Sequence, residues 1–553
     1  MYKLSAVLLL LILLSTPASA GWVISEFCPD GFASGDGDEY FVLEGLGSLS
    51  EISVSDGEGT LTFPSSSSSG KIIVARSAEA YYSVHSSYPD FEITDSSTKI
   101  PNVIKNGKFQ MANSDDELIL SVGGAASQKV SWPEDVKSSN GRIHIYENGV
   151  WDKRVLKIGQ SRFTPQTFTA DSAVLFVSPD SSYKEVIGFM DDADYKLLIS
   201  MYEFTSSDIA LAVSNACRRG VSVKILMEGG PVGGISEEEK GVLNYLTKSG
   251  ASVYTIESTS KLPARYRYLH AKYAVADDGA VLITSENFKE SGIPKTDTRG
   301  NRGWGAVIYD REVADYFSKV FTSDISGYDI YEYELSGETL PDSWSDVSAG
   351  AIFDSKTVYN VNVTPVISPD TSYLVEDLIG SSKISLDIQQ AYISKYPDSE
   401  NEWIASAINT AKRGVNLRVM LDGMYYNTED DADNDELIAS LNRLGLENVF
   451  AKLMNPDESI TKLHNKGVIS DGRYVLISSI NWNYNSPNNN REAGVIIESE
   501  EAAEYFTKVF NYDFSGVRTD FVSARIGIDF RLIIASVILT VFVSALIIRK
   551  IKK

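Results

Sequence analysis

An internal duplication limits the possible folds of this chain more than any other feature of its sequence. Five short landmarks occur twice, in the same order and about 190 residues apart. We therefore expect two copies of one folding unit, at residues 172–332 and 361–515, joined by a linker at residues 333–360. The landmarks are Ser178-Pro179-Asp180 with Ser368-Pro369-Asp370, Arg219-Gly220-Val221 with Arg413-Gly414-Val415, His270-Ala271-Lys272 with His464-Asn465-Lys466, Asn301-Arg302 with Asn490-Arg491, and Tyr316-Phe317 with Tyr505-Phe506.

Each copy alternates helix-like and strand-like segments. Asp208 to Arg219 has the apolar spacing of a helix that ends at Gly220, and a run rich in β-branched residues follows it. Hairpins are expected to turn at Asp278-Gly279 and at Asp471-Gly472. This pattern predicts the α/β class, with each copy an α/β sandwich in which helices cover a sheet.

Residues 21–165 have a different pattern. They contain short runs of strand-forming residues, such as Tyr40 to Leu43, Lys71 to Ala75 and Glu117 to Val122, separated by turn residues. This spacing predicts a small all-β domain, a sandwich of the immunoglobulin-like kind.

Both ends of the chain suggest export and anchoring. Residues 1–20 combine Lys3, a short apolar run and Ala18-Ser19-Ala20, the pattern of a cleaved signal peptide. Residues 532–548 form an uncharged apolar segment, followed by basic residues that favour the cytoplasmic side. We expect a single-pass protein of the cell membrane with a C-terminal transmembrane helix, a cytoplasmic C-terminus and the bulk of the chain outside. Two distant cysteines, Cys28 and Cys217, offer no disulfide framework.

The candidate chemistry lies in the histidines. The chain has four, and two of them occupy matched positions in the repeats. Each is followed by lysine two residues later and by aspartate seven residues later. Residues i and i+2 point to the same face of a strand, so an imidazole and an ammonium emerge side by side. The matched residues are His270, Lys272 and Asp277, then His464, Lys466 and Asp471.

A second matched pair of residues follows each motif. Ser285 and Asn287 recur as Ser479 and Asn481, again two positions apart. Each copy therefore presents an imidazole, a cation and two small hydrogen-bonding groups. This set suits a phosphate, because the cation and the donors neutralise its oxygens while a histidine on each side can attack and protonate in line.

These motifs resemble the phospholipase D superfamily, whose signature is His-x-Lys-x4-Asp followed by a Gly/Ser-Ser-x-Asn turn. The resemblance covers most of residues 172–515 and implies a pseudo-dimer in which both motifs meet at one site. It implies a two-step reaction without metal or other cofactor. His270 would attack phosphorus and form a phosphohistidine, while His464 would protonate the leaving alkoxide and then activate water or an acceptor alcohol.

The same resemblance implies roles for the remaining site residues. Glu492 matches the family carboxylate that orients a histidine, whereas the first copy has Gly303 at that position. One imidazole is therefore expected to lack its carboxylate, which would lower the rate. The implied phosphate ligands are Lys272, Lys466, Asn287 and Asn481, supported by Ser285 and Ser479, with structural roles for Asp277 and Asp471.

Residues 21–165 resemble lamin-tail domains. The resemblance rests on Ile24-Ser25-Glu26-Phe27, on the run from Asp38 to Leu43, on Asn113 to Leu120 and on the closing Gly159 to Phe163. It implies a module that binds a surface partner, and a structural spacer is the alternative.

Three functions follow as hypotheses. Membrane anchoring favours a phosphodiesterase or phosphatidyltransferase that acts on phospholipids. An extracytoplasmic nuclease is disfavoured by the formal net charge of −25, because an acidic surface repels nucleic acid. A degenerate, non-catalytic surface-binding protein would fit Gly303. Cations around the first motif either guide an anionic substrate inward or form a solvated basic face: Lys261, Arg265, Arg267, Arg299 and Arg302.

Overall fold

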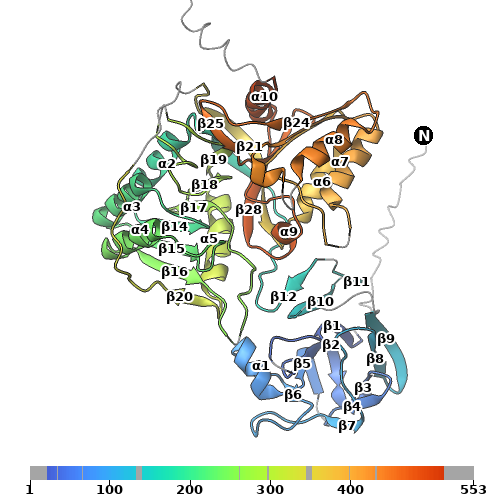
Figure 1. Cartoon of the computed structure of the whole chain (residues 1–553). Coiled ribbons are helices and arrows are strands. Elements are labelled where there is room, and N and C mark those ends of the chain that lie inside the picture. The colour runs from blue at the N-terminus through green and yellow to red at the C-terminus, as the bar shows by residue number, and fades with distance from the viewer. Residues whose placement is uncertain are drawn as a thin grey trace, which may run out of the picture.

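The computed structural model describes residues 21–515, except 34, 65–66, 133–139, 148, 153, 261, 296–297, 344–351, 398 and 430–432. The expected signal peptide (1–20) and transmembrane helix (532–548) lie outside the described residues. Within them, no helix is both long enough and apolar enough to cross a membrane. Figure 1 shows a small N-terminal domain beside a larger body of two lobes.

Two sheets form the N-terminal domain. They enclose one apolar core, in which Ile24, Phe41 and Leu43 face Leu61 and Leu118. A short helix, α1 (Ala78–His85), interrupts the strands that the sequence predicted. The first sheet has the order β11-β10-β1-β2-β5-β6, with β12 beside β10: β1 (Val23–Cys28), β2 (Tyr40–Ser48), β5 (Ser67–Ala75), β6 (Phe91–Glu92), β10 (Arg142–Glu147), β11 (Val150–Trp151) and β12 (Leu156–Lys157). The second has the order β7-β4-β3-β8-β9: β3 (Ile52–Ser55), β4 (Gly59–Thr62), β7 (Ile104–Gly107), β8 (Asp116–Val122) and β9 (Ala125–Trp132).

The body confirms the duplicated α/β architecture. Its strands follow one continuous order, in which the second copy repeats the first in reverse about a central antiparallel pair, β13 and β21. The first-copy strands are β13 (Phe168–Ser178), β14 (Lys196–Met201), β15 (Ser222–Glu228), β16 (Ser252–Ile256), β17 (Tyr273–Ala276), β18 (Ala280–Thr284), β19 (Gly300–Tyr309) and β20 (Ile330–Glu332), in the order β20-β16-β15-β14-β17-β18-β19-β13. The second-copy strands are β21 (Lys356–Ser368), β22 (Ser385–Gln390), β23 (Asn416–Asp422), β24 (Val449–Met454), β26 (Lys466–Ser470), β27 (Tyr474–Ser478) and β28 (Glu492–Glu498), in the order β21-β28-β27-β26-β22-β23-β24, while β25 (Ile460–Leu463) pairs with β19.

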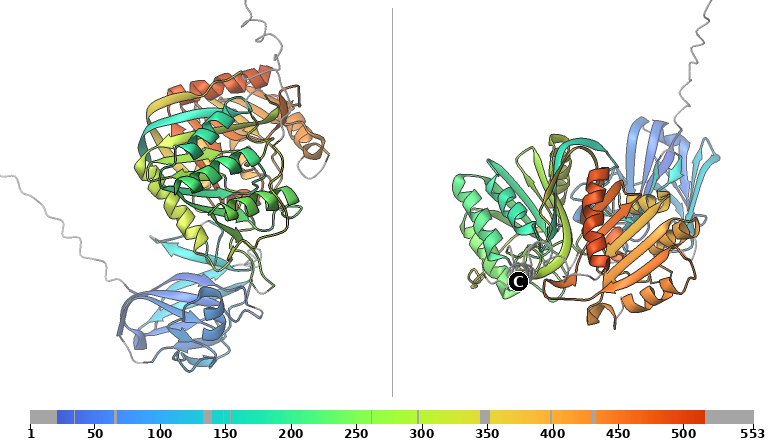
Figure 2. Two further views of the ribbon diagram at one scale, coloured as in Figure 1. Left: turned by 90° about the vertical axis from the view of Figure 1, so that its left-hand side faces the viewer. Right: turned by 90° about the horizontal axis from the view of Figure 1, so that it is seen from above.

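Helices cover the strands in layers. Seen from above, the outer helices of the two copies lie on opposite sides of the central strands (Figure 2). They are α2 (Ser182–Asp191), α3 (Ser207–Arg219) and α4 (Glu237–Lys248) in the first copy, and α6 (Tyr373–Ser381), α7 (Glu402–Lys412) and α8 (Asn434–Asn442) in the second. A short α9 (Asn485–Asn488) precedes β28. Between the copies, α5 (Arg311–Ile325) and α10 (Glu500–Ser515) contribute Phe317 and Phe506 to one shared core.

The local predictions agree closely with the observed elements. α3 ends at Arg219, and Gly220 takes the left-handed conformation, with φ of 93°. The two predicted hairpins form between β17 and β18 and between β26 and β27. β21 begins at Lys356, inside the range expected as linker, because the second copy uses these residues to pair with β13.

Candidate active site

The histidine of each His-x-Lys motif is held by the backbone of the opposite copy. The His270 N–H donates to the Arg491 carbonyl at 2.8 Å, and the His464 N–H donates to the Arg302 carbonyl at 2.9 Å. The His464 bond extends the short parallel pairing of β25 with β19. The His270 bond extends the equivalent parallel bridge between Leu269 and Arg491. The two motifs, distant in the chain, are therefore brought together by the contact between copies.

Both motif lysines are fully buried beside their histidines. Lys272 Nζ donates to the His270 carbonyl at 2.7 Å, and Lys466 Nζ donates to the His464 carbonyl at 2.5 Å. The lysine side chains have no solvent exposure, whereas the His270 and His464 side chains keep 13% and 18%. An ammonium carries three donors, so each lysine can also donate to a bound oxyanion.

The pKa values of the two motif histidines and the two motif lysines depend on charged groups from both copies. Burial lowers the pKa of His270 and, more strongly, that of His464. The charge of Lys466 further lowers the pKa of His270, and the charges of Lys272 and His270 further lower the pKa of His464. Burial also lowers the pKa of Lys272 to about 8 and that of Lys466 well below its usual value. A phosphate in this place would relieve the repulsion among these cations.

Glu492 orients His270. Its Oε2 lies 2.7 Å from His270 Nδ1 and accepts a hydrogen bond from Ser479 Oγ at 2.6 Å, and its Oε1 accepts one from Asn490 Nδ2 at 3.1 Å. Burial alone would raise the pKa of Glu492, but His270, Lys272 and the hydrogen bonds hold it below the usual value. The charged carboxylate therefore accepts a hydrogen bond from Nδ1–H, and Nε2 keeps its lone pair.

The expectation that one imidazole lacks a carboxylate is wrong. Glu286 Oε2 lies 3.1 Å from His464 Nδ1 and accepts a hydrogen bond from Asn301 Nδ2 at 2.9 Å. Glu286 comes from the Ser-x-Asn turn of the first copy, where the second copy has Ile480. Sequence comparison missed it because the carboxylate enters from a different chain position. An available signal was a glutamate between Ser285 and Asn287, two predicted site residues that follow a buried strand.

The serines and asparagines of the two turns lie next to this centre. Ser285 Oγ accepts the Trp304 N–H, and Ser479 Oγ accepts the Ala493 N–H, both at 3.0 Å. Asn287 Nδ2 donates to Glu203 at 2.9 Å. The buried Oδ1 atoms of Asn287 and Asn481 have no partner among the described residues. The side chain of Asn287 is therefore held in place through its amide nitrogen.

Asp277 and Asp471 lie away from the histidines, at the hairpin turns. Both have positive φ, 53° and 54°. The Asp277 carboxylate accepts three backbone N–H groups, at 2.8 to 3.0 Å, from the loop that enters β14. Asp471 binds the loop before β22 in the same way. Their contacts are those of structural anchors.

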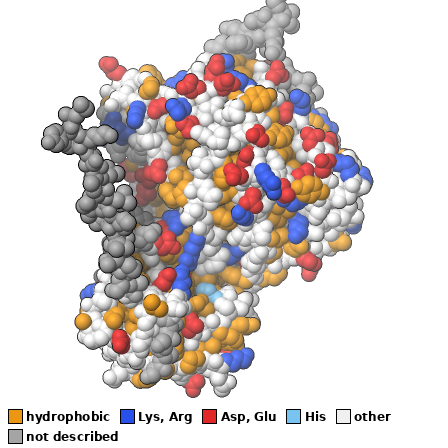
Figure 3. Space-filling view, turned by 180° about the vertical axis from the view of Figure 1, so that it is seen from behind, with side chains coloured by type: hydrophobic (Ala, Val, Ile, Leu, Met, Phe, Trp, Pro, Cys, Tyr) orange, Lys and Arg blue, Asp and Glu red, His pale blue; other side chains and the backbone are white. Residues whose placement is uncertain are grey.

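Two of the cations considered as a substrate guide are buried in ion pairs instead. Arg265 contacts Asp329 at 2.8 Å, and Arg302 contacts Asp180 at 2.6 Å. Their partners lie far away in the sequence, so the sequence could not reveal them. Arg267 is exposed, whereas Lys261 lies outside the described residues. Figure 3 shows acidic and basic side chains interspersed on one face of the molecule.

Two further carboxylates, not singled out from the sequence, support the histidine loops. Glu228 at the end of β15 accepts the Leu269 N–H at 2.6 Å, and Asp422 at the end of β23 accepts the Leu463 N–H at 2.8 Å. Burial raises the pKa of Glu228 to about 7. Each carboxylate fixes the residue that directly precedes the histidine of a His-x-Lys motif.

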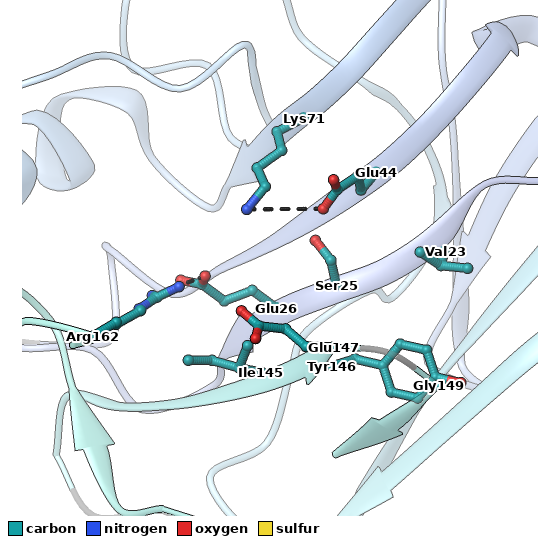
Figure 4. Close-up of a pocket in the computed structure, with 10 residues that line it drawn as sticks. All are labelled: Val23, Ser25, Glu26, Glu44, Lys71, Ile145, Tyr146, Glu147, Gly149 and Arg162. Atoms are coloured by element: carbon teal, nitrogen blue, oxygen red, sulfur yellow. Dashed lines mark hydrogen bonds and ion pairs between the residues drawn. The ribbon is translucent and has the colours of Figure 1, made fainter. Parts of the chain in front are cut away.

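The N-terminal domain has a separate hollow of about 500 Å³ (Figure 4). Three carboxylates and two cations are among the side chains that line it. Arg162 contacts Glu26 at 2.9 Å, and Lys71 lies 3.8 Å from Glu44, while Glu147 is the third carboxylate. Both cations of this hollow are therefore already paired with carboxylates.

Comparisons with known proteins identify the family of the two repeats. A family model described as "Cardiolipin synthase, PLD-like domain" matches twice, at residues 186–325 and 375–514. Cardiolipin synthase B of Salmonella typhimurium is 35% identical over 145 residues, which are 26% of this chain and 31% of that protein. Mitochondrial cardiolipin hydrolase of Canis lupus familiaris is 30% identical over 99 residues, which are 18% of this chain and 35% of that protein. The matched parts thus span about a third of each relative.

Solved structures also match. Phosphatidylserine synthase of Haemophilus influenzae is 13% identical, with a TM-score of 0.48, and the match covers 62% of this chain and 86% of that one. The phospholipase D family member Nuc of Salmonella typhimurium is 23% identical, with a TM-score of 0.25, and the match covers 31% of this chain and 99% of that one. The two family-model matches together cover half of the chain, and each contains one histidine–lysine motif. The chain therefore belongs to the phospholipase D-like family and carries the family's domain twice.

Proposed function

We propose that this chain is a phospholipase D-type phosphodiesterase or phosphatidyltransferase that acts through a phosphohistidine. The observation that carries the proposal is the pair of buried carboxylates, Glu492 and Glu286, each bound to the Nδ1 of a histidine from the other copy. A histidine held at Nδ1 offers Nε2 for nucleophilic attack or proton transfer. Two such histidines beside two buried lysines suit one phosphodiester.

The proposed reaction has two steps. In the first, His270 Nε2 attacks phosphorus, the bond from phosphorus to the leaving oxygen breaks, and His464 Nε2 gives that oxygen a proton. In the second, water or an acceptor alcohol attacks the phosphohistidine while His464 takes its proton, and the P–N bond electrons return to His270. Lys272, Lys466, Asn287 and Asn481 would hold the phosphate oxygens, with Ser285 and Ser479 supporting them.

The proposed substrate is a phospholipid. The similarity to proteins named cardiolipin synthase and cardiolipin hydrolase supports this class. We further propose a signal peptide at residues 1–20 and a membrane anchor at residues 532–548, which would keep the site near lipid headgroups outside the cytoplasm. The N-terminal domain, within residues 21–165, would be an immunoglobulin-like, lamin-tail-like module that binds a surface partner.

Headgroup release tests the proposal. The full-length protein in detergent is added to liposomes of phosphatidylglycerol and phosphatidylethanolamine, with an alcohol acceptor, and to single-stranded DNA at several salt concentrations. We expect headgroup release or exchange, which His270→Ala and His464→Ala abolish. Cleavage of DNA alone would support a nuclease, and inertness toward both and toward bis-p-nitrophenyl phosphate would contradict an enzyme.

A trapping experiment tests the intermediate. His464→Ala is incubated with bis-p-nitrophenyl phosphate, whose leaving group departs without a proton, so the first step proceeds while the second stalls. We expect a p-nitrophenyl phosphoryl group on His270, because only one of the two ester bonds is broken, detected by mass spectrometry under alkaline conditions. Its absence from His270, with the same group on another residue, would overturn the proposed roles.

A further inference from the structure

Glu286 and Glu492 reach equivalent places from non-equivalent positions. Glu492 lies on β28 and follows Asn490 by two residues, whereas the matched residue on β19 is Gly303. Glu286 instead enters from the turn after β18. In both copies the same asparagine serves the carboxylate: Asn490 donates to Glu492 at 3.1 Å, and Asn301 donates to Glu286 at 2.9 Å. The two carboxylates thus share a histidine contact and an amide contact.

Glu286 can occupy its place only because residue 303 is a glycine and has no side chain. A Cβ at residue 303 would lie 2.3 Å from Glu286 Oε1 and 2.6 Å from Glu286 Cγ. Side-chain atoms do not approach so closely, so any residue with a Cβ would displace the carboxylate. The glycine that seems to delete a catalytic-site group therefore makes room for its replacement.

We propose that Glu286 is the positioning residue for His464 and takes the place that a glutamate at residue 303 would have. This inference rests on the proposed function and deepens it. The contact fixes the His464 ring with Nε2 toward the phosphate, and the carboxylate stabilises the imidazolium that forms whenever His464 takes a proton.

The two histidines are held by carboxylates that have different numbers of hydrogen-bond partners. Glu492 has three side-chain partners, His270, Ser479 and Asn490. Glu286 binds His464 and Asn301, and its buried Oε1 has no partner among the described residues. The firmly held His270 suits the residue that carries the phosphoryl group. The more loosely held His464 suits the residue that repeatedly gains and loses a proton.

Histidine titration tests the contact without any turnover. The chain has four histidines, so 15N-histidine labelling of the full-length protein gives few ring signals, which His270→Asn and His464→Asn variants assign. Burial raises the pKa of Glu286, against the effect of Lys466 and Asn301. In Glu286→Gln we expect the His464 pKa to fall at pH values where this carboxylate is charged, because an anion near the ring is removed. The His270 pKa should not move, and Glu492→Gln should give the reverse pattern. Equal shifts of both histidines, or none, would overturn the proposal.

Kinetics and a swap test the role. Glu286→Gln should lower kcat about 10- to 100-fold with little change in KM, because the phosphate ligands remain. Glu286→Ile with Gly303→Glu copies the second repeat and should recover at least about 10-fold over Glu286→Ile alone. Glu239→Gln is the control, since this carboxylate is also buried but binds the Phe204 N–H instead of a motif histidine.

Three results decide between the explanations. A folded Glu286→Gln with wild-type kcat and pH profile would overturn the positioning role. A folded double variant no more active than Glu286→Ile would do the same. If the wild-type protein hydrolyses no phosphodiester, the proposed function fails, and the His464 titration still decides whether Glu286 sets the state of that ring.

Discussion

At the scale of single residues, the most unusual groups are the two motif lysines. Lys272 and Lys466 carry ammonium groups without solvent exposure, and each donates to the carbonyl of its own motif histidine. Burial is costly for a cation, and nearby Glu492 and Glu286 offset only part of that cost. A bound phosphate would supply the missing charge, so substrate affinity and lysine protonation are linked.

This linkage predicts a pH dependence. Lys272 has its pKa lowered to about 8, so its ammonium is charged below that pH and neutral above it. We expect kcat/KM for bis-p-nitrophenyl phosphate to fall as the pH rises through about 8, because the free enzyme loses a phosphate-binding cation. The measurement is kcat/KM between pH 5 and 10 at constant ionic strength. A profile that stays flat to pH 10 would show that Lys272 keeps its proton throughout.

At the scale of elements, the hairpins place the lysines and the asparagines. β17 and β18 turn at Asp277, whose carboxylate binds three backbone N–H groups of the loop before β14. β26 and β27 turn at Asp471 with the same contacts. The aspartate of the motif thus stabilises the hairpin from the end opposite the histidine.

Replacing this anchor should affect stability more than chemistry. Asp277→Ala removes three hydrogen bonds and places alanine at a positive φ, so we expect a loss of about 2–4 kcal/mol. Asp278→Ala in the same turn removes an exposed ion pair with Lys196 and a contact with the Tyr195 side chain, and should lower the free energy of unfolding much less. Urea unfolding followed by tryptophan fluorescence measures both. If Asp277→Ala keeps wild-type stability but loses activity, Asp277 has a chemical role.

The sequence predicted these elements well because each rests on local information. The turn at Asp278-Gly279 and the helix end at Gly220 are set by residues next to them in the chain. Long-range pairing was not accessible in this way. Arg302 was expected to face either a substrate or solvent because its partner Asp513 lies 211 residues later, in α10. Glu286 escaped notice because the copies were compared position by position, and the carboxylate has changed position.

At the scale of the whole molecule, two buried arginines connect the copies and the N-terminal domain. Arg302 of the first copy contacts Asp513 of the second at 3.0 Å, and Arg491 of the second contacts Asp324 of the first at 2.8 Å. Arg491 also donates to Ser161 Oγ at 2.5 Å, in the segment that closes the N-terminal domain. The carbonyls of the same arginines hold His464 and His270. Arg491 therefore contacts the N-terminal domain through its side chain and the backbone of His270 through its carbonyl.

This arrangement predicts that each cross-copy pair supports one particular histidine. Asp324→Asn should loosen Arg491 and therefore His270, whereas Asp513→Asn should loosen Arg302 and therefore His464. Weakening either fully buried pair should cost on the order of 3 kcal/mol. The two variants should differ in the first chemical step, which needs His270 but not His464 when the leaving group is p-nitrophenolate.

The burst of p-nitrophenolate in a His464→Ala background measures that step alone. There, Asp324→Asn should slow the burst at least about 10-fold, because a misplaced nucleophile loses its alignment with phosphorus. Asp513→Asn should leave the burst within about twofold, although it destabilises the fold equally, because its histidine is already removed. Asp315→Asn, an exposed residue of the same helix as Asp324, is the control and should change neither burst nor stability. Equal slowing by Asp324→Asn and Asp513→Asn would mean that the arginines hold the two copies together without selecting a histidine.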